Sequence, residues 1–174
     1  CLGLQGKDLS WPNWLGPNHD GTLDSFALPL PPGGKDYALA WTVKVGRGWA
    51  SPVCDSGTTV LHERDGENEV LRAMDSSTGK ESWRFSYRSD YQDNFGMEDG
   101  PRSTPAISGG LVVSHGPQGL VHAVSMKDGI LRWKVDLASK FSSPKGFFGR
   151  CSSPLVIDGK VVFDVGGPNA GMVA

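Results

Sequence analysis

Short apolar segments alternate with polar turns along most of the chain, and this pattern predicts β-strands. The stretch 51–85 shows it in full. Residues 58–62 and 69–74 mix β-branched and other apolar side chains with polar ones, as strands with one buried face do. Turn-forming residues at 55–57 and 75–79 separate the apolar runs. We therefore expect four strands in this stretch, at 51–54, 58–62, 69–74 and 80–85.

The same order of strands and turns begins again at Thr104-Pro105 and a third time at Ser153-Pro154. In the second copy we expect strands at 106–107, 111–114, 120–124 and 130–135. In the third copy we expect strands at 155–157 and 160–163, and the sequence ends within a third strand. The chain is thus built from repeats of one strand-rich unit.

A tryptophan ends each copy of a repeated sequence motif. Trp83 ends the phrase 73–83, Trp133 ends the similar phrase 123–133, and Trp41 ends a shorter match. The intervals of 42 and 50 residues lie in the range of repeat proteins. A large flat indole on a fourth strand can fill the wedge between neighbouring sheets. The repeat therefore predicts an all-β fold, a β-propeller of four-stranded antiparallel blades.

The repeats define the expected organisation of the chain. Residues 37–174 are predicted to form a partial propeller, preceded by a lead-in at 11–36 and a tail at 1–10. Within the propeller we expect a closing strand at 37–45, blades at 51–85 and 104–136, and an incomplete blade at 153–174. This makes about two and a half blades, whereas complete rings have roughly 4–8. We therefore expect an N-terminal fragment of a longer protein.

Composition and charge narrow the class of protein. The 174 residues are 38% hydrophobic and 21% charged, with a net charge of −2, which is typical of a soluble globular protein. No basic stripe indicates a nucleic-acid partner. No apolar run approaches the roughly 20 residues that cross a bilayer. The 24 glycines and 12 prolines agree with many tight turns between short strands.

The three cysteines and the first residues bear on the cellular compartment. Cys1, Cys54 and Cys151 form no Cys-x-x-Cys motif. For Cys54 and Cys151 two alternatives are open, a pair of buried free thiols or a disulfide between them. The tail at 1–10 is a signal-peptide remnant, the start of a mature chain with a lipid anchor on Cys1, or an arbitrary start. The first two alternatives place the protein outside the cytoplasm.

The repeated phrase resembles that of the pyrroloquinoline quinone (PQQ)-like repeat propellers. The matching residues are Asp75, Thr78, Gly79, Lys80 and Trp83. The second copy keeps Asp128 and Gly129 but starts differently, and residues 11–21 resemble the lead-in of extracytoplasmic members. The resemblance implies a periplasmic or secreted propeller, in which an N-terminal strand completes the last blade. The family contains both quinoprotein dehydrogenases and non-catalytic scaffolds such as the Bam-complex assembly lipoprotein.

The long connections between repeats, at 86–103 and 139–152, carry candidate binding residues. An arginine precedes each Ser-Pro or Thr-Pro start. We expect Arg47, Arg102 and Arg150 around the mouth of the central channel, where their guanidinium groups favour a carboxylate, phosphate or sulfate. In the alternative interpretation each arginine pairs with a local carboxylate, such as Glu98 or Asp99, and shapes its loop.

Trp49 and His115 complete the candidate set. Trp49 either stacks on a planar ligand or packs its loop, and His115 is the histidine with catalytic potential on the same face. The other histidines, including His62 and His122, are expected to be structural. No histidine pairing has metal spacing, and the loop carboxylates do not match an EF-hand. We therefore predict no metal site and name no catalytic residue.

Two functions follow from these patterns. The first is an extracytoplasmic binding or scaffold module, without enzymatic activity, that engages a protein or a small anionic ligand at the loop face around the central channel. The alternative is a PQQ-dependent quinoprotein dehydrogenase that oxidises an alcohol or sugar with PQQ and calcium. The resemblance implies two adjacent cysteines in many such dehydrogenases, and this sequence has none.

Overall fold

The computed structural model describes residues 10–23 and 39–174 and contains three antiparallel sheets. The first sheet consists of β1 (Val53–Asp55), β2 (Thr58–Asp65), β3 (Asn68–Asp75) and β4 (Glu81–Arg88). The second consists of β5 (Ala106–Ser108), β6 (Leu111–His115), β7 (Leu120–Ser125) and β8 (Leu131–Asp136). The third consists of β9 (Leu155–Ile157), β10 (Lys160–Gly167) and β11 (Ala170–Val173).

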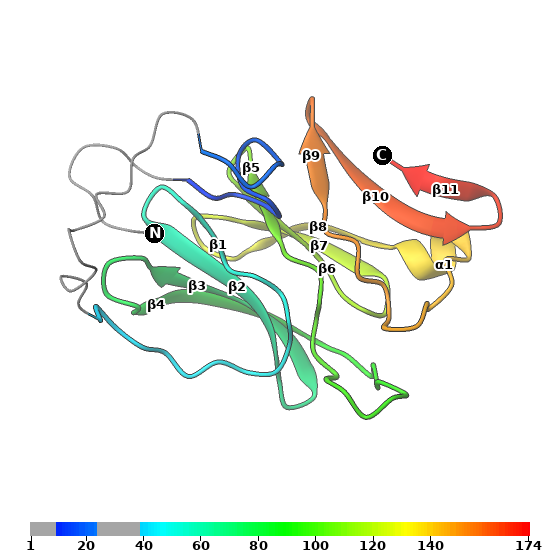
Figure 1. The fold of residues 1–174 in the computed structure, drawn as a ribbon, viewed down its shortest axis with the longest axis horizontal. Helices are drawn as coiled ribbons and strands as arrows, with labels where there is room; N and C mark the ends of the chain where they lie inside the picture. Colours follow the sequence, from blue (N-terminus) through cyan, green and yellow to red (C-terminus); the bar gives the residue numbers. More distant parts are fainter. Residues whose placement is uncertain (1–9, 24–38) are drawn as a thin grey trace.

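Each sheet is a meander in which neighbouring strands follow one another in the sequence. Figure 1 shows the sheets side by side, and the short first strands β1, β5 and β9 contact one another in that order. Apolar side chains fill the space between the first and second sheets, and a second apolar cluster lies between the second and third sheets. The predicted all-β, partial propeller is thus confirmed.

The tryptophans join one blade to the next. The Trp83 indole, on β4, donates a hydrogen bond of 2.8 Å to the Met126 carbonyl in the turn between β7 and β8. The ring lies on Gly129 in that turn, where an added Cβ would come within 2.6 Å of it. Trp41 covers the equivalent turn of the first sheet, with a 3.0 Å hydrogen bond to the Ser76 carbonyl. Trp83 therefore seals the joint between the first two blades, and Trp41 covers the matching turn of the first sheet.

Two local features qualify the predicted strands. Residues 39–45, part of the closing strand expected at 37–45, pair with none of the three sheets, so the closing strand stays a prediction. Conversely, a short helix that we did not expect, α1 (Leu137–Phe141), follows β8. The Asp136 side chain caps it by accepting a hydrogen bond of 3.0 Å from the Ser139 amide.

The bonding state of Cys54 and Cys151 matches neither of the two predicted alternatives. Cys54 is disulfide-bonded, whereas Cys151 is free and exposed in the loop before β9. The predicted Cys54–Cys151 pairing is therefore wrong, and so is a pair of buried thiols. Cys54 also pairs its backbone with Trp11, so the lead-in segment extends the inner edge of the first sheet. The alternatives for Cys1 lie outside the described residues.

Within the described part of the chain, no helix is long and apolar enough to cross a membrane.

Candidate functional site

All the long connections of the first two blades emerge at one end of the sheets, which we call the loop face. The first loop (89–105) joins β4 to β5, and the second loop (142–154) leads from α1 to β9. The connection from β6 to β7 (116–119) and the segment 46–49 lie against them. The tight turns between β1 and β2 and between β3 and β4 lie at the opposite end.

A buried arginine on β2 organises the first loop. Arg64 is only 7% exposed and donates hydrogen bonds to backbone carbonyls of that loop. Its acceptors are the carbonyls of Ser89, Tyr91 and Asp99, at 2.8, 2.8 and 3.2 Å. Because these carbonyls would otherwise lack partners away from water, Arg64 fixes the course of the loop.

Arg102 ties the first loop to the second. Its side chain is 8% exposed and forms a 3.1 Å ion pair with Asp93, which is 1% exposed. It also donates hydrogen bonds of 3.0 Å to the carbonyls of Glu98 and Phe148. The guanidinium lies 4.9 Å from the centre of the Trp49 ring. Arg102 therefore joins three segments from beneath and is not free to bind a ligand.

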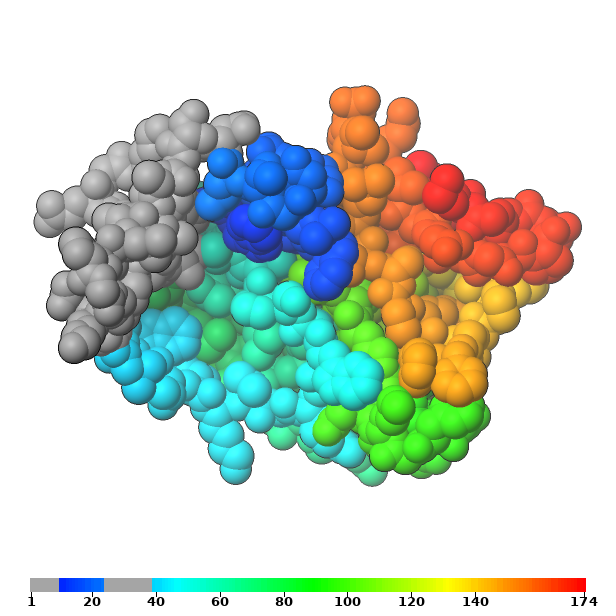
Figure 2. All heavy atoms as spheres, viewed as in Figure 1, coloured from blue at the N-terminus to red at the C-terminus, as the bar shows by residue number. Residues whose placement is uncertain are grey.

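Exposed apolar side chains lie above these arginines. Trp49, Phe95, Met97 and Phe147 are 55%, 51%, 52% and 61% exposed, and we call them the aromatic loop patch. The rings of Phe95 and Phe147 stack with centroids 3.8 Å apart, so the tips of the first and second loops touch. In Figure 2 the cyan, green and orange segments that carry the patch meet along the lower side of the molecule.

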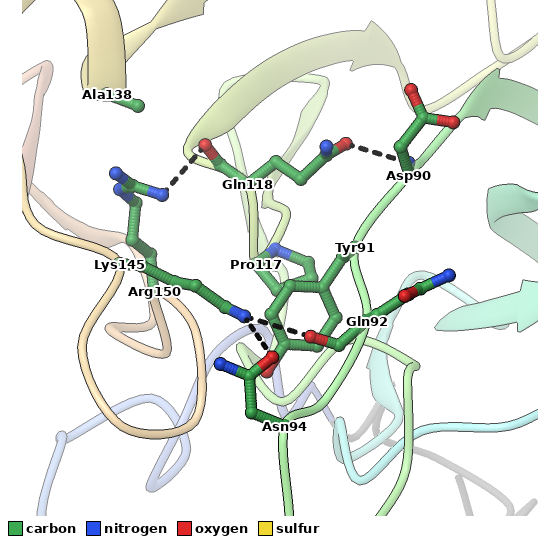
Figure 3. A pocket seen from close by; sticks show the side chains of 9 residues that line it. All are labelled: Asp90, Tyr91, Gln92, Asn94, Pro117, Gln118, Ala138, Lys145 and Arg150. Atoms are coloured by element: carbon green, nitrogen blue, oxygen red, sulfur yellow. Dashed lines mark hydrogen bonds between the residues drawn. The ribbon is translucent and has the colours of Figure 1, made fainter.

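A pocket of about 520 Å³ lies beside the patch, between the two loops and the connection 116–119. We call it the loop pocket. It is lined by Asp90, Tyr91, Gln92, Asn94, Pro117, Gln118, Ala138, Lys145 and Arg150. Figure 3 shows the Arg150 guanidinium at one end beside Gln118 and the Lys145 ammonium at the other end beside Asn94. Lys145 and Arg150, both from the second loop, thus face residues of the first loop and of the connection 116–119.

Neither cation of the loop pocket has a carboxylate partner within the described residues. Lys145 donates to the Gln92 carbonyl at 2.9 Å and to the Asn94 side-chain oxygen at 3.2 Å. Arg150 donates to the carbonyls of Gln118 and Ser143. Burial lowers the pKa of Arg150, and the charge of Asp136 offsets part of that effect. The pocket therefore holds two cations whose hydrogen-bond partners are neutral.

The three predicted arginines thus have different surroundings. Arg47 is half exposed and lies 3.3 Å from Asp99, and Arg102 is buried against Asp93, as the alternative interpretation expected. Arg150 differs because it lines a pocket without a carboxylate partner. They do not form one ring of free guanidinium groups, and their role in binding stays a prediction. Trp49 packs on Arg102 and still exposes half of its surface.

His115 directly precedes the connection 116–119 of the loop face but is buried beneath it. It ends β6, is only 1% exposed, and its Nδ1 lies 3.0 Å from the Ser152 carbonyl. Its ring meets Phe163 edge-on, and burial lowers its pKa. The prediction placed His115 in an accessible loop because the sequence does not show where β6 ends. In the structure it packs between the second and third blades, and its role in binding or catalysis stays a prediction.

A buried acidic network occupies the joint between the first two blades. Glu69, on β3, is fully buried and accepts hydrogen bonds from the hydroxyls of Tyr87 and Ser89, at 2.5 and 2.6 Å. The His62 Nε2 atom lies 3.4 Å from the carboxylate. We call these four residues the Glu69 network. Burial raises the pKa of Glu69, but His62, Ser89 and Tyr87 lower it more, so the group stays ionised.

His122 adjoins the Glu69 network from the second blade. Its ring lies 4.1 Å from that of Tyr87, centroid to centroid. Burial lowers its pKa from 6.5 to about 4, so the ring is neutral at pH 7. The buried nitrogens His62 Nδ1, His115 Nε2 and His122 Nδ1 have no hydrogen-bond partner in the described structure. The predicted structural role of His62 and His122 agrees with this burial.

Sequence reasoning missed Arg64, Tyr91 and Lys145. The sequence placed Arg64 in a polar loop after the strand expected at 58–62, whereas β2 extends through it. Lys145 follows a proline in a loop, and nothing in its neighbours indicates a cationic pocket. The one signal available was the length of the two connections, since long loops on rigid scaffolds commonly carry binding residues.

The sheets and their indole-sealed joints define the class of protein as a β-propeller of PQQ-like repeats. The family model described as outer membrane protein assembly factor BamB (PQQ_2) matches residues 34–174, and the chain belongs to this family. A curated relative, the outer membrane protein assembly factor BamB of Yersinia pestis, is 28% identical over 131 residues, 72% of this chain. The aligned part is 31% of the relative, so the chain spans under a third of its length.

Solved quinoprotein structures share the fold. A quinohemoprotein alcohol dehydrogenase from Comamonas testosteroni has a TM-score of 0.57 and 22% identity, over 89% of this chain and 23% of its own. The quinohemoprotein alcohol dehydrogenase ADHIIG of Pseudomonas putida HK5 has a TM-score of 0.52 and 24% identity, over 75% of this chain and 19% of its own. At these identities the likeness shows the fold alone.

The dehydrogenase alternative implies calcium beside PQQ. Within residues 10–23 and 39–174, no three His, Cys, Asp or Glu side chains lie close enough together to hold a metal ion. The loop carboxylates Asp93 and Asp99 are engaged by arginines. The described residues therefore do not fit calcium, which takes six to eight oxygen ligands. We derive no oxidation step from them.

Proposed function

We propose that this PQQ-like propeller is a binding or scaffold module that works outside the cytoplasm and engages a protein partner through its loop face. The observation that carries the proposal is the aromatic loop patch, whose four side chains are each more than half exposed. Exposed aromatic residues gathered from separate segments are typical of protein interaction sites, where such side chains dominate the binding energy.

The patch is also held in place, which favours binding. Arg64 and Arg102 fix the backbone of the first loop from below, and the Phe95–Phe147 stack joins the first loop to the second. A surface that is ordered before it meets a partner loses little conformational entropy on binding.

Two observations support a location outside the cytoplasm. Cys54 is disulfide-bonded, and such bonds persist mainly in oxidising compartments. The matching family is described as an outer membrane protein assembly factor. The aromatic loop patch would then be presented to proteins of that compartment.

A site-specific photocrosslinker tests the proposal in cells that make the protein. We expect a crosslinker at position 147 to capture a discrete protein, identified by mass spectrometry, and Trp49→Ala to reduce the yield at least fivefold. The matched controls carry the crosslinker at positions 77 and 127, which are exposed in turns at the opposite end of the sheets. These positions should capture nothing in common with position 147.

Equal capture from positions 77, 127 and 147, or none from 147, contradicts the proposal. A second assay addresses the alternative function directly. If the purified protein, mixed with PQQ and calcium, oxidises alcohols with a dye as electron acceptor, the role as a non-catalytic module is wrong.

A further inference from the structure

The loop pocket has a chemistry that differs from that of the aromatic loop patch beside it. We propose that the loop pocket binds a small organic polyanion, whose carboxylate or phosphate groups lie between Arg150 and Lys145. The inference rests on the proposed binding role of the loop face and adds a ligand class that the patch does not explain. The argument comes from unused donors, from the placement of carboxylates, and from the size of the pocket.

The two cations keep unused N–H donors. A guanidinium has five N–H groups, and Arg150 uses three, on the Gln118 carbonyl and on the carbonyl and hydroxyl of Ser143. An ammonium has three, and Lys145 uses two, on Gln92 and Asn94. Three charged donors therefore remain, and charge-assisted hydrogen bonds to an anion are the strongest use for them.

The amide groups at the pocket add neutral donors. The side-chain oxygen of Gln118 accepts a hydrogen bond of 3.2 Å from the Asp90 amide, and that of Asn94 accepts from Lys145. Each amide oxygen is thus occupied, and each side-chain NH₂ group is left without a protein partner in the described structure. A ligand rich in acceptor oxygens, such as a polycarboxylate, matches this set of donors.

The acidic side chain at the pocket does not neutralise the cations. Asp90 lies 3.2 Å from Arg88, which is exposed on the rim of the first blade. Figure 3 shows the Asp90 carboxylate directed away from Lys145 and Arg150. The charge of Asp136 acts on Arg150, but neither pocket cation forms an ion pair, so an anion between Arg150 and Lys145 is attracted by both.

The size and lining of the pocket suit a small molecule. Its volume of about 520 Å³ lies in the range of small-ligand sites. The Tyr91 and Pro117 rings line one side of the pocket next to the cations (Figure 3), and the Lys145 ammonium lies 4.9 Å from the centre of the Tyr91 ring. A ligand with anionic groups at two ends and a short carbon skeleton between them fits this layout.

Isothermal titration calorimetry of the purified protein with defined anions tests the proposal. The probes are citrate, inorganic phosphate, glucose 6-phosphate and acetate, with neutral glycerol as a blank. We expect saturable binding of citrate or glucose 6-phosphate, and binding of acetate at least tenfold weaker. A preference for citrate identifies carboxylates as the recognised groups, and a preference for glucose 6-phosphate or phosphate identifies phosphates.

Matched variants locate the site. Lys145→Gln and Arg150→Gln should each weaken binding at least tenfold, whereas Arg132→Gln, at an exposed arginine of β8 that does not line the pocket, should leave it unchanged. If Arg150→Gln fails to fold, Lys145→Gln alone decides the result. No saturable binding of any anion, or equal binding by Lys145→Gln and the parent protein, overturns the proposal. Photocrosslinking at position 147 is scored separately, so loss of either activity is distinguishable from loss of the other.

Discussion

The joint between the first two blades and the loop pocket both gather charged side chains, but they satisfy them differently. In the joint, both oxygens of the buried Glu69 carboxylate accept hydrogen bonds from hydroxyl groups. In the pocket, Arg150 and Lys145 stay partly exposed, have only neutral partners, and keep unused donors. A buried charge must be satisfied inside the fold, because water cannot reach it. An exposed charge with spare donors is free to meet a ligand.

The largest expected effect comes from removing the carboxylate of the Glu69 network. Glu69→Ala leaves the hydroxyls of Tyr87 and Ser89 without their acceptor. We expect the free energy of unfolding to fall by about 3–5 kcal/mol, as when one partner of a buried charged network is removed. Urea denaturation followed by tryptophan fluorescence measures the change.

Glu67→Ala is the matched control for this variant. Glu67 is two residues away in the sequence, 75% exposed, and lies 3.5 Å from Arg88. Its loss should cost under about 0.5 kcal/mol. A loss below about 1 kcal/mol for Glu69→Ala would show that the joint does not depend on its buried charge, and the contrast with the pocket would disappear.

The indole that seals the same joint gives the next largest effect. Trp83→Ala removes a 9% exposed side chain and its hydrogen bond to Met126, and should cost about 3–4 kcal/mol. Trp133→Ala, at the equivalent position of the second blade, removes a side chain that is 38% exposed, and should cost about 1–2 kcal/mol. Equal losses in thermal or chemical denaturation would show that the repeated indoles do not differ in this way.

The sequence predicted these repeated features well, because their cause is local. Trp83 and Gly129 belong to phrases of a dozen residues that recur, and recurrence reveals which residues seal a joint. The loop face was predicted only as a location. Arg64 reaches the Ser89 carbonyl 25 residues away, and Lys145 reaches the Gln92 carbonyl 53 residues away. Such contacts depend on how two irregular loops pack against each other, and no sequence periodicity indicates them. For the same reason the burial of His115 escaped prediction.

Acidification should destabilise the joint between the first two blades, because protonation of the buried His122 ring is unfavourable there. The pKa of His122 is lowered by burial from 6.5 to about 4. As the pH falls, the unfolded chain takes up the proton first, so the stability contributed by the neutral ring is complete above pH 6.5 and is lost between pH 6.5 and about 4. We expect a loss of about 1–3 kcal/mol over this range in denaturant melts. Glu69, whose pKa is also lowered, adds a loss below its ordinary value of 4.5.

Two variants separate this titration from general acid effects. His122→Phe keeps the ring contacts with Tyr87 and Phe85 and should flatten the profile between pH 6.5 and 4. His19→Gln, at an exposed histidine of the lead-in segment, should leave the profile unchanged. A profile that keeps its slope in His122→Phe would assign the loss to other groups.

The smallest effect on stability is expected in the loop pocket. Lys145→Met keeps the length and apolar stem of the side chain and removes one of two cations without carboxylate partners. It loses two exposed hydrogen bonds, to Gln92 and Asn94, and a cation–π contact with Tyr91. Because exposed contacts contribute little, we expect a net change within about 0.5–1 kcal/mol, smaller than for either joint variant. Urea denaturation of the variant and the parent protein measures the change. A loss above about 2 kcal/mol would mean that Lys145 holds the two loops together as Arg102 does, and the pocket would then be part of the framework rather than a place for a ligand.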